Sequence, residues 1–234
     1  MDRLTRKGLK QDKFAQEVGH TVEFLGEHRK QLVLYGGIGL AAIAITVGLF
    51  YYNNRQHANR QRELSTAMAL MNAPIGQNAA PGSVTFTTAD LRTRAVVKAL
   101  GNLATSGAGS EEGTVARYYL GTMAVGQGRL DEAAKHFNDA AGSGNQVYGS
   151  VAKLALADVY RAQNKTADAE KLLRGLMDNS TILVSKEEAT IALARLLAPA
   201  KPEEARKLLE PLRAAPGAVG RTATAAYTEL ALGK

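Results

Sequence analysis

The chain of 234 residues carries a net charge of +7, contains no cysteine, and draws only 6% of its residues from the aromatic amino acids. The lack of cysteine excludes disulfides, cysteine-ligated metals, a thiol nucleophile and a cysteine-linked lipid anchor. The basic residues are scattered singly among acidic ones with few aromatics between them, which argues against a nucleic-acid interface and suits a neutral or acidic protein partner.

Residues 1–31 form a basic leader in which apolar residues recur at helical spacing. The recurring residues are Phe14, Val18, Val22 and Leu25. They predict a partly amphipathic helix. Such a helix either lies on the inner membrane face, or touches a cytosolic partner, or is a solvated helix that merely precedes the next segment.

Residues 32–52 contain no charged residue. A helix of that length spans about 31 Å at ~1.5 Å per residue, which matches the hydrocarbon core of a bilayer. Tyr35, Tyr51 and Tyr52 lie near its ends, where interfacial aromatics are common. A cleaved signal peptide is disfavoured because the leader is long and because the run ends in large residues. The sequence therefore predicts a retained transmembrane helix.

The orientation of this helix is indicated by the charges on its two sides. The leader contains seven Lys or Arg residues, whereas a comparable stretch after the apolar run contains three. Positive flanks stay in the cytoplasm, which predicts a cytoplasmic N-terminus and a C-terminal domain on the other side of the membrane. Within about 15 residues of the run the counts are two and three, so this prediction depends on the more distant lysines.

Small residues recur along one face of the apolar run. Gly37, Ala41, Ala44 and Gly48 fall at i, i+4, i+7 and i+11. Small side chains let two helices approach closely in lipid, where packing drives association. We predict that this face packs against another membrane helix, although Gly and Ala are common in membrane helices in any case.

Residues 53–87 predict a helical extension followed by a loop. The extension has Leu64, Ala67, Met68 and Met71 at helical spacing, so the anchor helix is expected to continue and to pack on the next helix. From residue 73 to residue 86 the chain is rich in Gly, Pro and Ala and shows no periodicity, which indicates a loop.

Residues 88–234 contain an internal repeat. Ala133, Ala169 and Ala205 lie 36 residues apart, and each is followed at four and seven residues by further apolar or small residues. A second set precedes them by 13 residues with the same period: Leu120-Gly121, Leu156-Ala157 and Ala192-Leu193. Each unit therefore predicts two helices, which the alanine allows to approach closely.

This period divides the domain into three full units at about 114–149, 150–185 and 186–219. A helix that begins near Thr88 precedes them, and a capping helix at 220–232 closes the stack. The expected fold is all-α: one N-terminal transmembrane helix followed by an α-solenoid. The alternative is an ordinary helical bundle in which the spacing is fortuitous.

The repeated residues resemble those of the tetratricopeptide repeat family. The residues that carry the resemblance are Leu120, Gly121, Ala133, Phe137 and Ala140, and then Leu156, Ala157, Tyr160 and Ala169. In the third unit Ala192 and Leu193 exchange the large and small positions. The resemblance implies a stack of helix pairs that offers an extended groove to a peptide or a partner helix.

First helices line the concave face of such a stack. By position, the residues expected to face this partner-binding groove are Tyr118, Thr122, Leu154, Asp158, Arg161 and Ala194. We expect no cofactor, metal or small-molecule substrate. The repeat region has the single histidine His136 and no nucleophile–base set, and its glycine-containing turns do not form a phosphate-binding loop.

The whole layout resembles the YfgM-like family of bacterial inner-membrane proteins, which implies a single-pass protein of that membrane with its C-terminal domain in the periplasm. The resemblance depends on the apolar run and on general repeat residues such as Leu120-Gly121 and Ala133. It implies three kinds of partner: the protein-export channel, a membrane-anchored periplasmic chaperone, and translocating polypeptides. The expected function is a non-enzymatic, membrane-anchored adaptor of the translocon and chaperone network. A scaffold for envelope assembly or division that binds folded partners is the alternative, and an enzyme with an unrecognised site is a third reading.

Overall fold

The computed structural model describes residues 29–76 and 84–232 of the chain. Over these residues the structure is helical and contains no strand beyond one isolated bridge between Ile75 and Phe86. The all-α prediction is therefore confirmed. The predicted helix in the leader lies outside the described residues. By its internal contacts the chain divides into two compact units, residues 1–57 and 58–234.

The first unit is described from residue 29, and it contains the apolar part of α2 (Arg29–Met71). The side chains of residues 33–55 are all exposed. The segment includes a window with a mean hydropathy of 2.1 of which no part is buried, so α2 is long and apolar enough to cross a membrane. The Thr46 hydroxyl donates to the Ala42 carbonyl at 2.8 Å, which satisfies its hydrogen bond without water.

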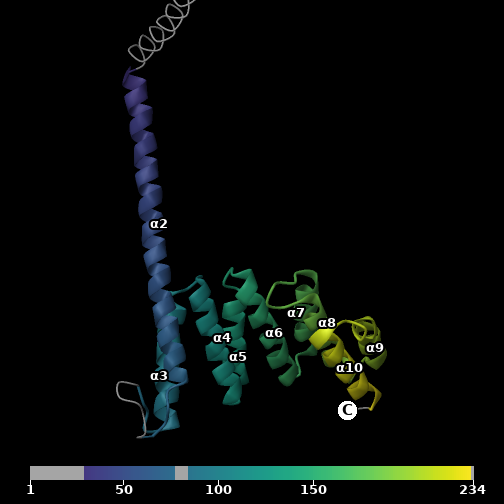
Figure 1. The fold of residues 1–234 in the computed structure, drawn as a ribbon. Helices are drawn as coiled ribbons and strands as arrows, with labels where there is room; N and C mark the ends of the chain where they lie inside the picture. The colour runs from purple at the N-terminus through teal and green to yellow at the C-terminus, as the bar shows by residue number, and fades with distance from the viewer. Residues whose placement is uncertain (1–28, 77–83, 233–234) are drawn as a thin grey trace, which may run out of the picture. The chain divides into compact units, whose positions relative to one another are not determined.

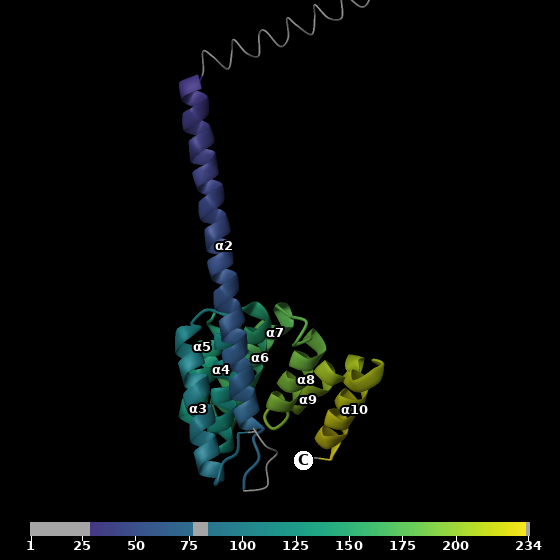
Figure 2. The ribbon, with the colours of Figure 1, turned by 60° about the vertical axis from the view of Figure 1, so that its left-hand side comes forward.

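The second unit is a stack of antiparallel helices that follow one another in chain order (Figures 1 and 2). It begins with the last part of α2 and continues with α3 (Ala89–Ser106), α4 (Glu111–Gly126), α5 (Leu130–Ala141), α6 (Gln146–Ala162), α7 (Thr166–Asp178), α8 (Lys186–Leu197), α9 (Pro202–Leu209), the 3-10 turn η1 (Glu210–Leu212) and α10 (Gly217–Ala231). Each of α4 to α9 packs against its neighbours in sequence, and α4 also contacts α6. We call α4, α6 and α8 the first helices and α5, α7 and α9 the second helices.

The two sets of helices begin in different ways. Each first helix has a side-chain cap, because Ser110, Asn145 and Ser185 each accept a hydrogen bond from a backbone N–H at the start of the helix. The cap residues of the second helices make no such bond, and all of them are basic: Arg129, Lys165 and Lys201. Acidic residues in the first turn of each second helix lie beside its positive end.

The turns within the units repeat as well. Gly128 and Asn164 occupy equivalent places, 36 residues apart, and both have a positive φ, at 72° and 61°. Glycine and asparagine tolerate this left-handed conformation better than other residues. Pro202 opens α9 at its first turn, where the missing N–H costs no helical hydrogen bond.

The core runs between the two sets of helices. The three repeated alanines, Ala133, Ala169 and Ala205, are completely buried. Gly121 lies so close to Phe137 that a Cβ atom there would stand 2.7 Å from the ring. The equivalent pair in the next unit is Ala157 and Leu173, both buried in one cluster. The same space between a first and a second helix is thus filled by Gly121 and Phe137 in the first unit and by Ala157 and Leu173 in the second.

The two ends of the stack are closed differently. At the start, Ala67 of α2 is buried against Val96 and Leu100 of α3, as the spacing in the extension predicts. At the other end α10 buries Ala223 and Ala226 and has no following helix among the described residues. Its remaining faces stay largely exposed.

Candidate partner-binding groove

The register of the first helices decides which side chains reach the surface. In α4 and α6 the buried large and small residues are Leu120-Gly121 and Leu156-Ala157. In α8 the fully buried pair is Leu193-Ala194, while Ala192 is only half-buried. The third unit therefore keeps the usual large-then-small order, shifted by one residue from the 36-residue period.

This shift changes the residue that α8 presents to the groove. Ala194 is completely buried, so it offers no surface to a partner. The residue equivalent to Thr122 and Asp158 is Arg195, and all three of these side chains are exposed. Arg195 therefore replaces Ala194 in the set of groove residues.

A hollow of about 360 Å³ lies between α4 and α6. We call it the apolar hollow, because Tyr118, Val125, Leu130 and Phe137 supply much of its wall. The Tyr118 ring leans on the Phe137 ring with their centroids 5.6 Å apart, which fixes its position. Four of the predicted groove residues line this hollow: Tyr118, Thr122, Asp158 and Arg161.

Two further hollows, of about 450 and 440 Å³, lie over α6, α8 and α10. Both are lined by Asp158, Ala192 and Arg195, and the second also by Leu154. We call them the arginine hollows. Asp158 lines all three hollows, so they adjoin one another along the first helices, and we call them together the groove. The structure thus brings five of the six predicted groove residues together on this groove.

The charges in the groove are mixed. Arg161 lies 3.6 Å from Asp158, one turn back on the same helix. Arg195 makes no ion pair with any residue in the described part of the chain, although Glu229 lines the same hollow. Both arginines extend long, flexible side chains into a surface that is otherwise largely apolar, so the groove can bind side chains of more than one kind.

The described residues do not assemble a catalytic or metal-binding set. No group of three His, Asp or Glu side chains there could hold a metal ion. His136 is partly buried on α5, and its nearest acidic partner is Glu132 at 3.7 Å, one turn back on the same helix. That pair lies on a second helix and lines none of the three hollows.

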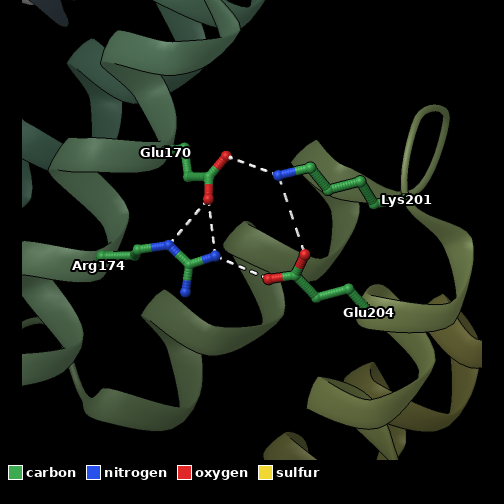
Figure 3. Close-up of polar contacts among 4 residues, drawn as sticks. All are labelled: Glu170, Arg174, Lys201 and Glu204. Atoms are coloured by element: carbon green, nitrogen blue, oxygen red, sulfur yellow. Dashed lines mark hydrogen bonds and ion pairs between the residues drawn. The ribbon is translucent and has the colours of Figure 1, made fainter.

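Two of the second helices are joined by a cluster of charges away from the groove (Figure 3). Arg174 of α7 donates to Glu170 at 2.7 and 2.9 Å and to Glu204 of α9 at 2.7 Å. Lys201 lies 3.5 Å from Glu170 and 3.9 Å from Glu204. The hydrogen bonds from Arg174 hold the pKa of Glu170 below its usual range. The cluster ties the third unit to the second.

The predicted membrane packing face lies in the first unit. Ala41 and Ala44 are exposed, and nothing would approach within 4 Å of a Cβ atom placed at Gly37 or Gly48. The face is thus bare within the described chain, and its membrane partner stays a prediction.

Several groove residues are not predicted by a strict 36-residue alignment: Ala192, Arg195, Val219 and Glu229. The signal that identifies Arg195 is present in the sequence. Leu193-Ala194 keeps the large-then-small order of Leu156-Ala157, and this places Arg195 beside Asp158 in register.

Comparison with protein-family models gives one match. A model described as a tetratricopeptide repeat-like domain matches residues 28–181, which include all of α2 to α7. No curated protein and no solved structure matches the chain. The match agrees with the helix pairs and the repeated alanines described above.

Proposed function

The chain belongs to the tetratricopeptide repeat-like domain family, and from this premise we propose that it is a membrane-anchored adaptor whose groove binds protein partners. Domains of this family are interaction modules and typically carry no catalytic activity. The observation that supports the proposal most is the row of adjoining hollows over α4, α6, α8 and α10, in a domain that follows a helix of membrane length.

We place the protein in a bacterial inner membrane with its N-terminus in the cytoplasm. The exposed apolar part of α2 supports the span, and the excess of Lys and Arg before it supports the orientation. Alkaline phosphatase fused after Lys234 should then be active, and green fluorescent protein fused there should not fluoresce. The opposite pair of results would overturn the orientation and leave the groove untouched.

The partners that fit this location are the protein-export channel, a membrane-anchored periplasmic chaperone, and translocating polypeptides. The layout of a short leader, one span and a repeat domain is that of the YfgM-like family, and it supports this choice. The groove supports it too, because its apolar wall and flexible arginines suit segments of varied sequence.

A photo-crosslinking amino acid placed in the groove tests this function in intact cells. We expect crosslinked proteins when it replaces Thr122 or Asp158, both exposed on the groove. The matched control is Lys171, which is exposed on the second helix α7 and lines no hollow. Equal crosslinking at the three positions, or none at the groove positions, would contradict the proposal.

The identity of the crosslinked proteins separates a chaperone-network adaptor from a scaffold. Many exported polypeptides together with the export channel fit the adaptor. A single folded envelope protein in a fixed ratio fits the scaffold instead. The purified chain in detergent should also delay the aggregation of an unfolded client if it is an adaptor, and a scaffold should not.

A further inference from the structure

We propose that the loop between α7 and α8, residues 179–185, touches the bilayer through Ile182 and Leu183 and so sets which way the tethered repeat domain faces. This inference rests on the membrane anchor of the proposed function. It concerns the side chains of Ile182 and Leu183, which line none of the three hollows, and their occupant is lipid.

The loop is built so that one isoleucine projects from it. Ile182 is 90% exposed and Leu183 is 44% exposed, whereas the next residue, Val184, is buried in the core. Among the large apolar residues of the described repeat domain, Ile182 has the most exposed side chain. The core does not bury Ile182, so its side chain is free to contact another surface.

The loop holds this conformation through its own hydrogen bonds. The Thr181 backbone N–H donates to the Val184 carbonyl at 2.9 Å, and the Val184 N–H donates to the Thr181 hydroxyl at 3.1 Å. The same hydroxyl lies 2.7 Å from the Ser150 hydroxyl of α6. Ile182 is therefore presented on a fixed turn, which reduces the entropy lost when it binds a surface.

The loop lies at the end of the second unit where the chain enters it. The helices alternate in direction, so the starts of α4, α6, α8 and α10 share the end at which α2 enters the second unit (Figures 1 and 2). The loops there at residues 107–110, 142–145 and 179–185 contain no charged residue, whereas the connection at 213–216 contains Arg213. The turns at the opposite end each carry a basic residue: Arg129, Lys165 and Lys201.

Chain connectivity keeps the start of the second unit, at Ala58, close to the bilayer. Tyr52, at the end of the apolar run, is six peptide units from Ala58, which can reach at most about 20 Å at ~3.3–3.6 Å per residue. A tethered surface meets the membrane at a high effective concentration, so two apolar side chains are enough to bias its orientation. The uncharged loops on the same side add no cost of burying charge near the lipid.

The chain has no cysteine, so single labels can be placed cleanly. We would label the full-length Ile182→Cys variant with an environment-sensitive nitrobenzoxadiazole dye and reconstitute it, one chain per disc, in nanodiscs of phosphatidylcholine and phosphatidylglycerol. Lipids with a spin label near the acyl carbonyl act as quenchers. The matched control is Gln127→Cys, an exposed position in the turn between α4 and α5 at the opposite end.

We expect a blue-shifted emission and several-fold stronger quenching at residue 182 than at residue 127. A second pair uses a dye on Ser180→Cys, whose quenching should fall to the level of the control when Ile182→Asp is added. Emission typical of water at residue 182, equal quenching at 182 and 127, or no effect of Ile182→Asp overturns the proposal.

A dye on Ala44→Cys separates this proposal from the anchor on which it depends. Quenching at residue 44 without quenching at residue 182 refutes the loop contact and leaves the anchor standing. No quenching at either position refutes both. Since the discs contain no partner protein, a loop that binds a protein instead of lipid would give the first of these results.

Discussion

The first and second helices of the repeat domain obey different constraints. The second helices begin at Leu130, Thr166 and Pro202, each 36 residues after the last. The first helices begin at Glu111, Gln146 and Lys186, so their starts are 35 and 40 residues apart. The regular set carries the buried alanines, and the irregular set carries the groove. The spacing of helix starts is thus kept in the set that carries the buried alanines, and it varies in the set that lines the groove.

The largest loss of stability should come from the core between the two sets. Phe137→Ala removes a buried ring and leaves a cavity beside Gly121, so we expect the free energy of unfolding to fall by about 3–5 kcal/mol. Urea unfolding of the full chain in detergent, followed by circular dichroism, measures this. Val125→Ala on the first-helix surface should change it by less than ~0.5 kcal/mol. Equal losses would erase the distinction between core and groove.

The shifted register of α8 predicts opposite outcomes at two neighbouring alanine positions. Ala194→Leu adds atoms to a filled core and should cost about 1–3 kcal/mol. Ala192→Leu faces the arginine hollows and should cost less than ~0.5 kcal/mol. The same unfolding measurement compares the two variants. If Ala192→Leu proved the more harmful, the strict 36-residue register would be correct and the shift would be wrong.

The pairing of Gly121 with Phe137 should behave as a unit. Gly121→Ala alone places a methyl group against the ring and should cost about 1–3 kcal/mol. Adding Phe137→Leu recreates the alanine and leucine pair of the second unit, so the double variant should lose less stability than the two single variants together. A double-mutant cycle measures this coupling, which we expect at about 0.5–3 kcal/mol. Additive losses would show that the two residues do not share one space.

The smallest effect should come from the charged cluster that joins α7 to α9. Its side chains are partly exposed, so Arg174→Ala should cost about 0.2–1 kcal/mol at neutral pH. Because the folded state lowers the pKa of Glu170, this contribution is complete above the ordinary glutamate pKa of about 4.3 and is lost as the pH falls through the lowered value. Unfolding at pH 7 and near pH 3, with and without high salt, tests this.

Arg94→Ala is the matched control for the charged cluster, since Arg94 makes a single exposed pair with Asp90 on one helix. It should cost less than Arg174→Ala and show a weaker dependence on salt. A difference between the wild-type chain and Arg174→Ala that stayed constant down to pH 3 would mean that Arg174 acts through packing and not through Glu170.

Much of this fold could be predicted from the sequence because close contacts between helices restrict which residues can occupy the repeated positions. The alanines at 133, 169 and 205 must be small wherever two helices cross, so their period is legible without a structure. The extension of α2 can be predicted in the same way, since Ala67 and its apolar neighbours lie at helical spacing. The 36-residue period gives the wrong register for α8, because the lengths of the connections on either side of this helix set its register. The 179–185 loop is longer than the equivalent loop at 142–145, and no periodicity encodes that.

The candidate groove was predicted unevenly for the same reason. In α4 and α6 the 36-residue step placed Tyr118, Thr122 and Asp158 on one surface. In α8, the next first helix, the same step selects the buried Ala194 in place of Arg195. In α10 the step aligns Glu229 with the buried residues Leu193, Ala157 and Gly121, so the period alone does not predict that Glu229 lines the groove.

The final helix, α10, also bears on whether copies of the repeat domain can stack end to end. α10 turns Arg221, Thr224 and Thr228 to solvent on the side away from its buried alanines. A charged and hydroxylated end does not offer the apolar surface on which a further repeat would stack. Copies of this domain are therefore not expected to stack end to end through α10, and the stack of helices does not extend from one copy into the next.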